Sequence, residues 1–233
     1  DLRIAVQYAS PQWGNVASFS ETAGLLTTRG WAAANYAMGT NRRASKAAFE
    51  TFLCRPIETW RVPNLPANRI RRDVDRTPGG DARIFQTECR TCHSTLDGLS
   101  GAMLHQEFTA KGFVQSPAAL DKFIQHADVY PEGYVPQDRS WINELAESND
   151  PIARTFGWRG PSRGEGIKAL GEMLAASESF SACLAKRVFS VVCFQERELA
   201  DPVITELARE FETQDSYRLK DLFVRAALRP ECQ

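Results

Sequence analysis

The sequence lacks the features that would place it among nucleic-acid-binding or membrane-spanning proteins. Its 28 basic and 29 acidic residues leave a formal net charge of −1, so no strong attraction to nucleic acid or to an anionic membrane is expected. The longest apolar run, residues 188–194, is too short to span a bilayer and contains a cysteine. With 43% hydrophobic residues in 233, the chain can bury one sizeable core or two small ones.

The common signatures of hydrolytic and nucleotide-dependent enzymes are also missing. The chain contains no H-E-x-x-H motif, no Ser-His-Asp signature and no calcium-binding loop. The glycine-rich residues 157–166 lack the Gly-Lys-Ser/Thr ending of a phosphate-binding loop. The carboxylates are dispersed, and no acid/base pair stands out, so we predict no catalytic residue.

Histidine is scarce, yet one of the three histidines directly follows a closely spaced cysteine pair. The pentapeptide is Cys89-Arg90-Thr91-Cys92-His93, and random placement of these residue types would give roughly 0.002 such motifs in the chain. C-x-x-C-H is the pattern of covalent haem attachment. The two thiols add to the porphyrin vinyl groups, and the histidine is placed to bind the iron as the proximal ligand. The motif therefore predicts one covalently bound haem c.

Three alternatives compete for this motif. Structural zinc needs two further Cys or His ligands at short spacing, and the chain has no second C-x-x-C. A thioredoxin-like redox pair requires a βαβ context, whereas an Arg-rich and turn-rich segment precedes Cys89. A plain disulfide between Cys89 and Cys92 is the third alternative.

The ligand at the sixth iron position separates electron transfer from ligand chemistry. A Met or His there closes the iron and favours one-electron exchange, whereas an open position would admit a small molecule. Met103 is our first candidate because it follows the motif closely, and His126 and His105 are the alternatives.

Haem propionates are often held by arginine through charge-assisted hydrogen bonds. Several arginines precede the motif, and Arg71, Arg72 and Arg83 are our candidates for propionate contacts. The competing interpretation is a solvated basic loop that nearby aspartates neutralise.

Four cysteines remain outside the motif, an even number that suggests two disulfides. Cys183 and Cys193 are ten residues apart in one expected helix, hence about 15 Å apart and too far to bridge. If the last three helices run up, down and up, Cys193 pairs with Cys232 and Cys54 pairs with Cys183. The alternative is that some are buried free thiols.

The apolar periodicity predicts a mainly α fold. We expect a helical c-type haem domain with long irregular wrapping loops over residues 1–130, and an aromatic, Gly- and Pro-rich connecting region over residues 131–166. A C-terminal three-helix bundle then follows over residues 167–233. Asp201-Pro202, for example, combines a helix N-cap with a proline at the first helical position. The disulfides and the absence of an initiator Met suggest a mature, exported chain, hence a periplasmic or extracellular protein.

Three segments resemble the paired C-terminal domains of unknown function in the large planctomycete-type cytochrome c proteins. They are residues 21–31 with Gly39-Thr40, residues 89–93 with Leu96-Asp97-Gly98-Leu99, and residues 180–189 with residues 217–223. The resemblance implies an exported, haem-associated protein of two-part helical architecture. It implies no substrate.

Together these features predict a mono-haem c-type cytochrome that carries electrons rather than catalyses a reaction. A single haem moves one electron, so a redox partner protein is expected, in a membrane-associated or multi-subunit complex if the chain is a subunit. The alternatives are a peroxidase-like or small-molecule-binding haem protein with an open sixth position, and a structural or interaction module that haem staples together. Rapid binding of carbon monoxide to the reduced protein would distinguish the open-iron alternative from a closed electron carrier.

Overall fold

Most of the described chain is helical, as the sequence predicted, and its strands are short. The computed structural model describes residues 21–39, 41–71, 73–120, 122 and 134–232. The α-helices are α2 (Arg29–Asn35), α3 (Arg42–Phe52), α4 (Ala82–Ile84), α5 (Arg90–Gly98), α6 (Glu144–Glu147), α7 (Pro151–Arg154), α8 (Gly166–Ala176), α9 (Glu178–Cys193), α10 (Pro202–Thr213) and α11 (Leu219–Ala227). The strands are β1 (Gln106–Thr109), β2 (Gly112–Gln115), β3 (Ser140–Ile142) and β4 (Arg163–Glu165). Shorter turns are the 3₁₀ helices η2 (Gly24–Thr27), η3 (Ile57–Trp60), η4 (Pro78–Gly80), η6 (Ser100–Met103) and η8 (Pro230–Cys232), and the π-helical turn η5 (Phe85–Cys89).

Several helices begin where the sequence supplies a capping side chain. Asp201 accepts a hydrogen bond from the Val203 backbone N–H at 2.8 Å, and Pro202 occupies the first position of α10, as predicted. The hydroxyl of Ser177 similarly accepts from the Phe180 N–H at the start of α9. These caps satisfy backbone donors that have no partner within the helix.

The connecting regions contain more regular structure than the sequence indicated. β1 and β2 form a hairpin in which Thr109 is opposite Gly112, whose φ of 104° suits glycine. In the expected connecting region, residues 131–166, β3 pairs antiparallel with β4. Strands of three or four residues are too short to show an alternating apolar pattern. Their formation depends on the partner strand more than on their own sequence.

A large hydrophobic cluster joins α2, α3, α5 and α8 to the loops between them. Its aromatic centre is Phe49, whose ring centroid lies 4.4 Å from that of Trp60, with Phe156 stacked on Trp158 beside it. Gly101 lets this body close tightly, because a Cβ there would lie 2.0 Å from the Ser140 carbonyl oxygen. The start of β3 is thereby held directly against η6.

A second cluster lies between α9, α10 and α11, which form the expected C-terminal three-helix unit. Its buried side chains include Phe189, Leu207, Phe211 and Leu222. The helix α8 contributes its apolar face to the large cluster instead. The expected division into residues 1–130, 131–166 and 167–233 stays a prediction.

Both predicted disulfides are confirmed. Cys54 pairs with Cys183, which joins the end of α3 to α9, and Cys193 pairs with Cys232, which joins the end of α9 to η8. The first therefore fixes the N-terminal half of α9 against the larger body, and the second fixes its C-terminal end within the C-terminal unit.

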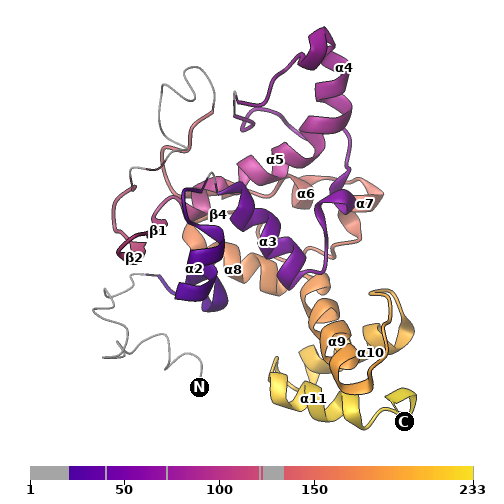
Figure 1. Cartoon of the computed structure of the whole chain (residues 1–233). Coiled ribbons are helices and arrows are strands. Elements are labelled where there is room, and N and C mark those ends of the chain that lie inside the picture. Colours follow the sequence, from indigo (N-terminus) through magenta and orange to yellow (C-terminus); the bar gives the residue numbers. More distant parts are fainter. Residues whose placement is uncertain (1–20, 40, 72, 121, 123–133, 233) are drawn as a thin grey trace.

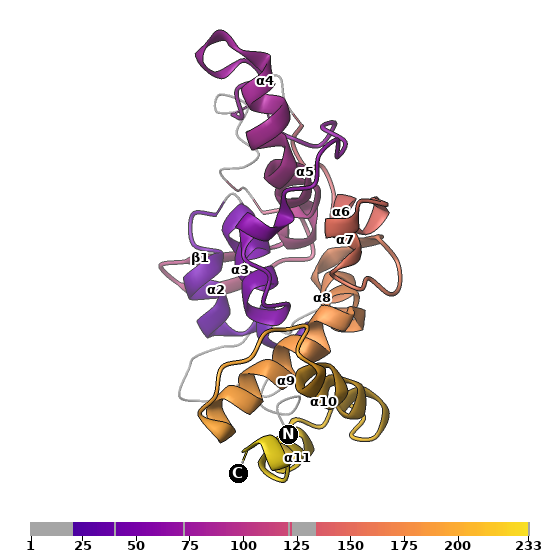
Figure 2. The same cartoon turned by 90° about the vertical axis from the view of Figure 1, so that its right-hand side faces the viewer.

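The molecule is elongated (Figures 1 and 2). In both views α9, α10 and α11 lie at one end, and α4 projects at the opposite end, with α5 running from it into the body. The segment from α4 into α5 therefore lies on the side of the body away from the C-terminal unit. None of the helices in the described ranges has the length and apolar character needed to cross a bilayer.

Removing the Cys54–Cys183 disulfide should destabilise the protein. We expect the double variant Cys54→Ser/Cys183→Ser to lose about 4 kcal/mol of unfolding free energy, because the bridge closes a very long loop. The matched variant Cys193→Ser/Cys232→Ser should lose somewhat less, because its cysteines are 39 rather than 129 residues apart. Urea unfolding under oxidising conditions measures both. Unchanged stability in the first variant would contradict the expectation.

Candidate functional site

The cysteine motif lies on a continuous helical segment with an irregular turn in it. The segment begins at α4, where the side chain of Asp81 accepts a hydrogen bond from the Arg83 backbone N–H. It widens into the π-helical turn η5, which ends at Cys89, and continues as α5 from Arg90. Such π-turns are rare and frequently mark functional sites.

Cys89 and Cys92 are the two free thiols, since the other four cysteines are paired. Each is partly buried against apolar side chains. Cys89 packs beside the small cluster of Ile70, Val74 and Phe85, and Cys92 packs against the large cluster. Burial raises the pKa of the Cys92 thiol, more than the neighbouring Thr91 lowers it, so this sulfur is not activated as a thiolate.

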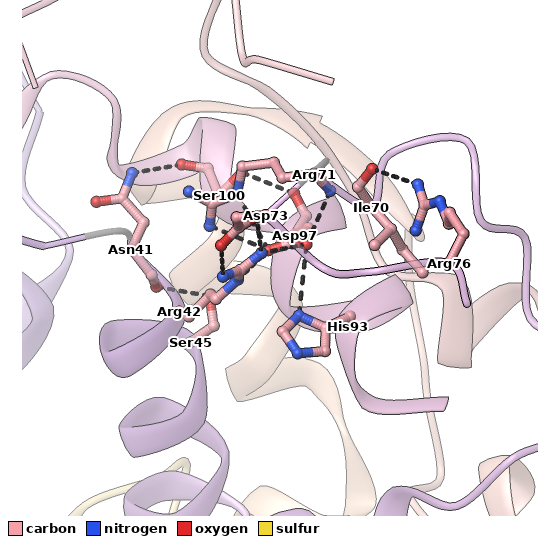
Figure 3. Close-up of polar contacts among 10 residues, drawn as sticks. All are labelled: Asn41, Arg42, Ser45, Ile70, Arg71, Asp73, Arg76, His93, Asp97 and Ser100. Atoms are coloured by element: carbon pink, nitrogen blue, oxygen red, sulfur yellow. Dashed lines mark hydrogen bonds and ion pairs between the residues drawn. The ribbon is translucent and has the colours of Figure 1, made fainter. Parts of the chain in front are cut away.

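His93 turns one ring nitrogen into the protein. Its Nδ1 is buried and lies 3.6 Å from Oδ2 of Asp97, one helical turn later, just beyond ordinary hydrogen-bond distance. Figure 3 shows the other ring nitrogen on the side away from this carboxylate. A carboxylate only accepts hydrogen bonds, so the arrangement favours the tautomer with its proton on Nδ1 and a lone pair on Nε2.

Asp97 is fully buried and is clamped by two arginines (Figure 3). Arg42 donates from Nε to Oδ1 at 2.5 Å and from Nη2 to Oδ2 at 2.9 Å. Arg71 donates from Nη2 to Oδ1 at 3.0 Å and from its backbone N–H to Oδ2 at 3.2 Å. Burial alone would raise the pKa of Asp97, but His93 and the two guanidinium groups hold it well below the usual range. The carboxylate therefore stays ionised.

Arg42 is shared with a second carboxylate, that of Asp73. The two carboxylates outweigh the effect of burial and raise the pKa of Arg42. Asp73 belongs to the loop that passes over α5, and Arg76 of the same loop donates to the Ile70 carbonyl and lies 4.5 Å from the centre of the Phe85 ring. Ion pairs and packing thus join α3, this loop and α5 next to the thiols.

The arginines proposed for propionates have different surroundings. Arg71 is buried and bonded to Asp97, and the exposed Arg83 is bonded to Asp81. Arg72 lies outside the described residues. The role of these arginines in binding a propionate stays a prediction.

The candidates for the sixth iron position are also placed only in part. Met103 is fully buried in the large cluster. His105 has Nδ1 2.9 Å from the Ser116 carbonyl oxygen, which favours a proton on Nδ1 and a free lone pair on Nε2. His126 lies outside the described residues. Met103 and His105 therefore both remain predictions for the sixth iron ligand.

A buried lysine next to Met103 was not singled out from the sequence. The ammonium group of Lys122 donates to the side-chain oxygen of Asn41 at 2.7 Å and to the carbonyls of Met103 and Gln106 at 3.1 and 2.6 Å. Burial lowers the pKa of Lys122 to about 8, although the carboxylate of Glu107 is 3.6 Å away. Nothing in the sequence around Lys122 distinguishes it from a surface lysine.

The residues of the motif fit a covalent haem. They provide two unpaired thiols beside apolar clusters, and a histidine whose buried Nδ1 leaves Nε2 facing the other way. Among the described residues, no group of three or more His, Cys, Asp or Glu side chains gathers closely enough to hold a metal ion. Structural zinc normally needs four such ligands, whereas haem iron needs one proximal histidine.

The sequence did not predict the contact of Asp97 with His93, because Asp97 entered only as part of the segment Leu96-Asp97-Gly98-Leu99. The usable signal was its spacing of four residues from His93 on one helix, which places both on one face. Arg42 had no comparable signal, because it is 55 residues away in the chain.

No protein-family model matches the chain, and the searches of curated proteins and of solved structures gave no match either. The resemblance to the planctomycete-type cytochrome c proteins therefore stays a prediction, and the functional argument rests on the site itself.

Replacing Asp97 should destabilise the fold strongly. In Asp97→Asn the buried Arg71 and the half-buried Arg42 lose their common counter-charge, so we expect the free energy of unfolding to fall by about 3 kcal/mol. Asp81→Asn is the matched control, because Asn keeps the helix cap and the pair with Arg83 is solvent-exposed. Urea unfolding should show no measurable loss for the control. Equal stability of the two variants would contradict this account of Asp97.

Lys122 should make stability rise with pH in the alkaline range. Between the folded pKa of about 8 and the ordinary value of 10.5, the unfolded chain binds a proton that the folded chain does not. Unfolding therefore becomes less favourable as pH increases, by about 3 kcal/mol over the full interval. Lys122→Met should abolish this rise, and Lys111→Met, which removes an exposed lysine, should keep it. The measurement is the slope of unfolding free energy against pH.

Proposed function

We propose that this chain is an exported mono-haem c-type cytochrome that transfers single electrons to or from a protein partner. The observation that carries the proposal is the combination of two free thiols at C-x-x-C spacing with a following histidine whose Nδ1 faces a buried carboxylate. A haem bound here would supply one-electron exchange at its iron.

Each residue of the motif has a separate task in this proposal. Cys89 and Cys92 would each form a thioether bond to a vinyl group, which fixes the porphyrin to η5 and α5. His93 would bind the iron through Nε2. The ionised Asp97 lies behind its ring and disfavours a reversed ring orientation, in which Nε2 would face inward.

The surroundings of the two thiols support haem attachment better than they support a redox-active cysteine pair. The raised pKa of Cys92 does not suit a redox-active thiolate, which requires an electropositive, partly exposed environment. The apolar clusters beside both sulfurs suit a porphyrin face. The motif lies where η5 passes into α5, on the segment that both views place away from α9, α10 and α11 (Figures 1 and 2), and we expect the redox partner to bind on this side.

Export to an oxidising compartment is part of the proposal. The pairs Cys54–Cys183 and Cys193–Cys232 support it, because disulfides persist in the periplasm and outside the cell. Haem attachment would occur in the same compartment, and the two thiols of the motif have to remain reduced until then.

The test is expression with export to a bacterial periplasm that contains a haem-attachment system. The purified protein should carry one haem, measured by intact mass and by the pyridine haemochrome spectrum, and should titrate as a one-electron couple. Cys89→Ala/Cys92→Ala should abolish covalent attachment, because both sulfur bonds are lost. Cys193→Ser/Cys232→Ser should retain it, since that pair lies at the other end of the molecule (Figure 1).

The proposal fails if the wild-type protein is colourless, or if Cys89 and Cys92 bind another metal or each other. Rapid binding of carbon monoxide to the reduced protein would contradict a closed electron carrier. That result would favour the small-molecule-binding alternative with an open sixth position.

A further inference from the structure

A buried anion stands directly behind the proposed iron ligand. His93 and Asp97 are one turn apart on α5, and Nδ1 to Oδ2 is 3.6 Å. Nδ1 has no other partner within hydrogen-bond distance, although it is buried. An orphaned buried donor is costly, and such contacts are often long before a site is loaded and tighten when it fills.

We propose, on the basis of the function above, that Asp97 is the positioning residue of the iron ligand. Its carboxylate takes the hydrogen bond from His93 Nδ1, fixes the ring orientation and makes Nε2 a stronger electron donor to the iron. Ligating histidines generally need such an outer partner, which may be a carbonyl, a water or a carboxylate. A carboxylate is the strongest of these acceptors because it carries a full charge.

The arginine clamp gives Asp97 a fixed direction. Oδ1 receives hydrogen bonds from side-chain nitrogens of both Arg42 and Arg71, and Oδ2 receives Arg42 Nη2 and the backbone N–H of Arg71. The carboxylate cannot rotate without breaking these contacts, so Oδ2 keeps facing His93 (Figure 3). Asp97 is therefore held in place by Arg42 of α3 and by Arg71 of the loop over α5.

The two arginines also determine how strongly the negative charge of Asp97 acts on the imidazole of His93. The cluster contains two guanidinium groups and the carboxylates of Asp73 and Asp97, so its formal charges balance. Asp97 nevertheless is the only one of the four in contact with His93 among the pairs the structure describes. Hydrogen bonding to an anion gives the imidazole partial imidazolate character, which stabilises ferric over ferrous iron.

Two variants separate contact with His93 from simple loss of charge. Asp97→Asn removes the anion that touches Nδ1, and Asp73→Asn removes one negative charge from the other side of Arg42. In Asp97→Asn we expect a weaker iron–histidine bond, seen as a lower iron–histidine stretching frequency in resonance Raman spectra of the ferrous protein. The reduction potential should shift to more positive values. In Asp73→Asn the anion next to Nδ1 is kept, so the stretching frequency should change much less than in Asp97→Asn.

If the sixth position is occupied, the stretching mode is recorded on the five-coordinate photoproduct of the carbon monoxide complex. A structural role of Asp97 alone would not move this frequency. An unchanged frequency in a folded, haem-loaded Asp97→Asn protein overturns the inference.

Arg42→Gln is the second variant, in case Asp97→Asn does not fold. It keeps Asp97 and Arg71 but removes part of the charge that neutralises Asp97, so the frequency should rise and the potential should fall. No shift in Arg42→Gln, where Asp97→Asn cannot be obtained, also overturns the inference.

Haem content separates this inference from the proposed function. Intact mass and the haemochrome spectrum are measured on every variant. A wild-type protein without haem defeats both proposals, whereas a haem-loaded protein with unshifted spectra defeats only the role of Asp97.

Discussion

The burial of one ionised carboxylate is the constraint on which the organisation of the site depends. An isolated charge in the interior would cost many kcal/mol, so Asp97 is tolerable only while Arg42 and Arg71 hold it. Those arginines come from α3 and from the loop over α5, 55 and 26 residues away in the chain. The need to compensate one charge thereby brings together three segments that apolar packing alone would not orient.

This charge compensation lies next to a region of quite different chemistry. Cys89 and Cys92 sit beside apolar side chains, and the His93 ring faces the polar cluster next to them. A covalent cofactor at this boundary would have an apolar face for its ring and a polar anchor behind its iron ligand. The remote end of the molecule is held by disulfides instead, so changes there need not reach the thiols (Figures 1 and 2).

Much of the fold was predictable because its signals are local. The cap of α10, the apolar periodicity of the C-terminal helices and the disulfide pairing follow from residue spacing and helix geometry. The paired strands β1–β4 were not predicted, because segments of three or four residues have too few side chains to show a period. The π-helical turn before Cys89 likewise has no recognised sequence pattern.

The sequence by itself determined the cysteine motif, the order of the helices and which cysteines could not pair, since all of these depend on neighbours along the chain. Only the tertiary structure decided that Asp97 faces His93 from within a clamp, that Arg71 serves this carboxylate, and that Lys122 is enclosed by oxygens. Apart from the pair His93–Asp97, these contacts join residues far apart in the chain, and their energies depend on burial and on charges that no local pattern specifies.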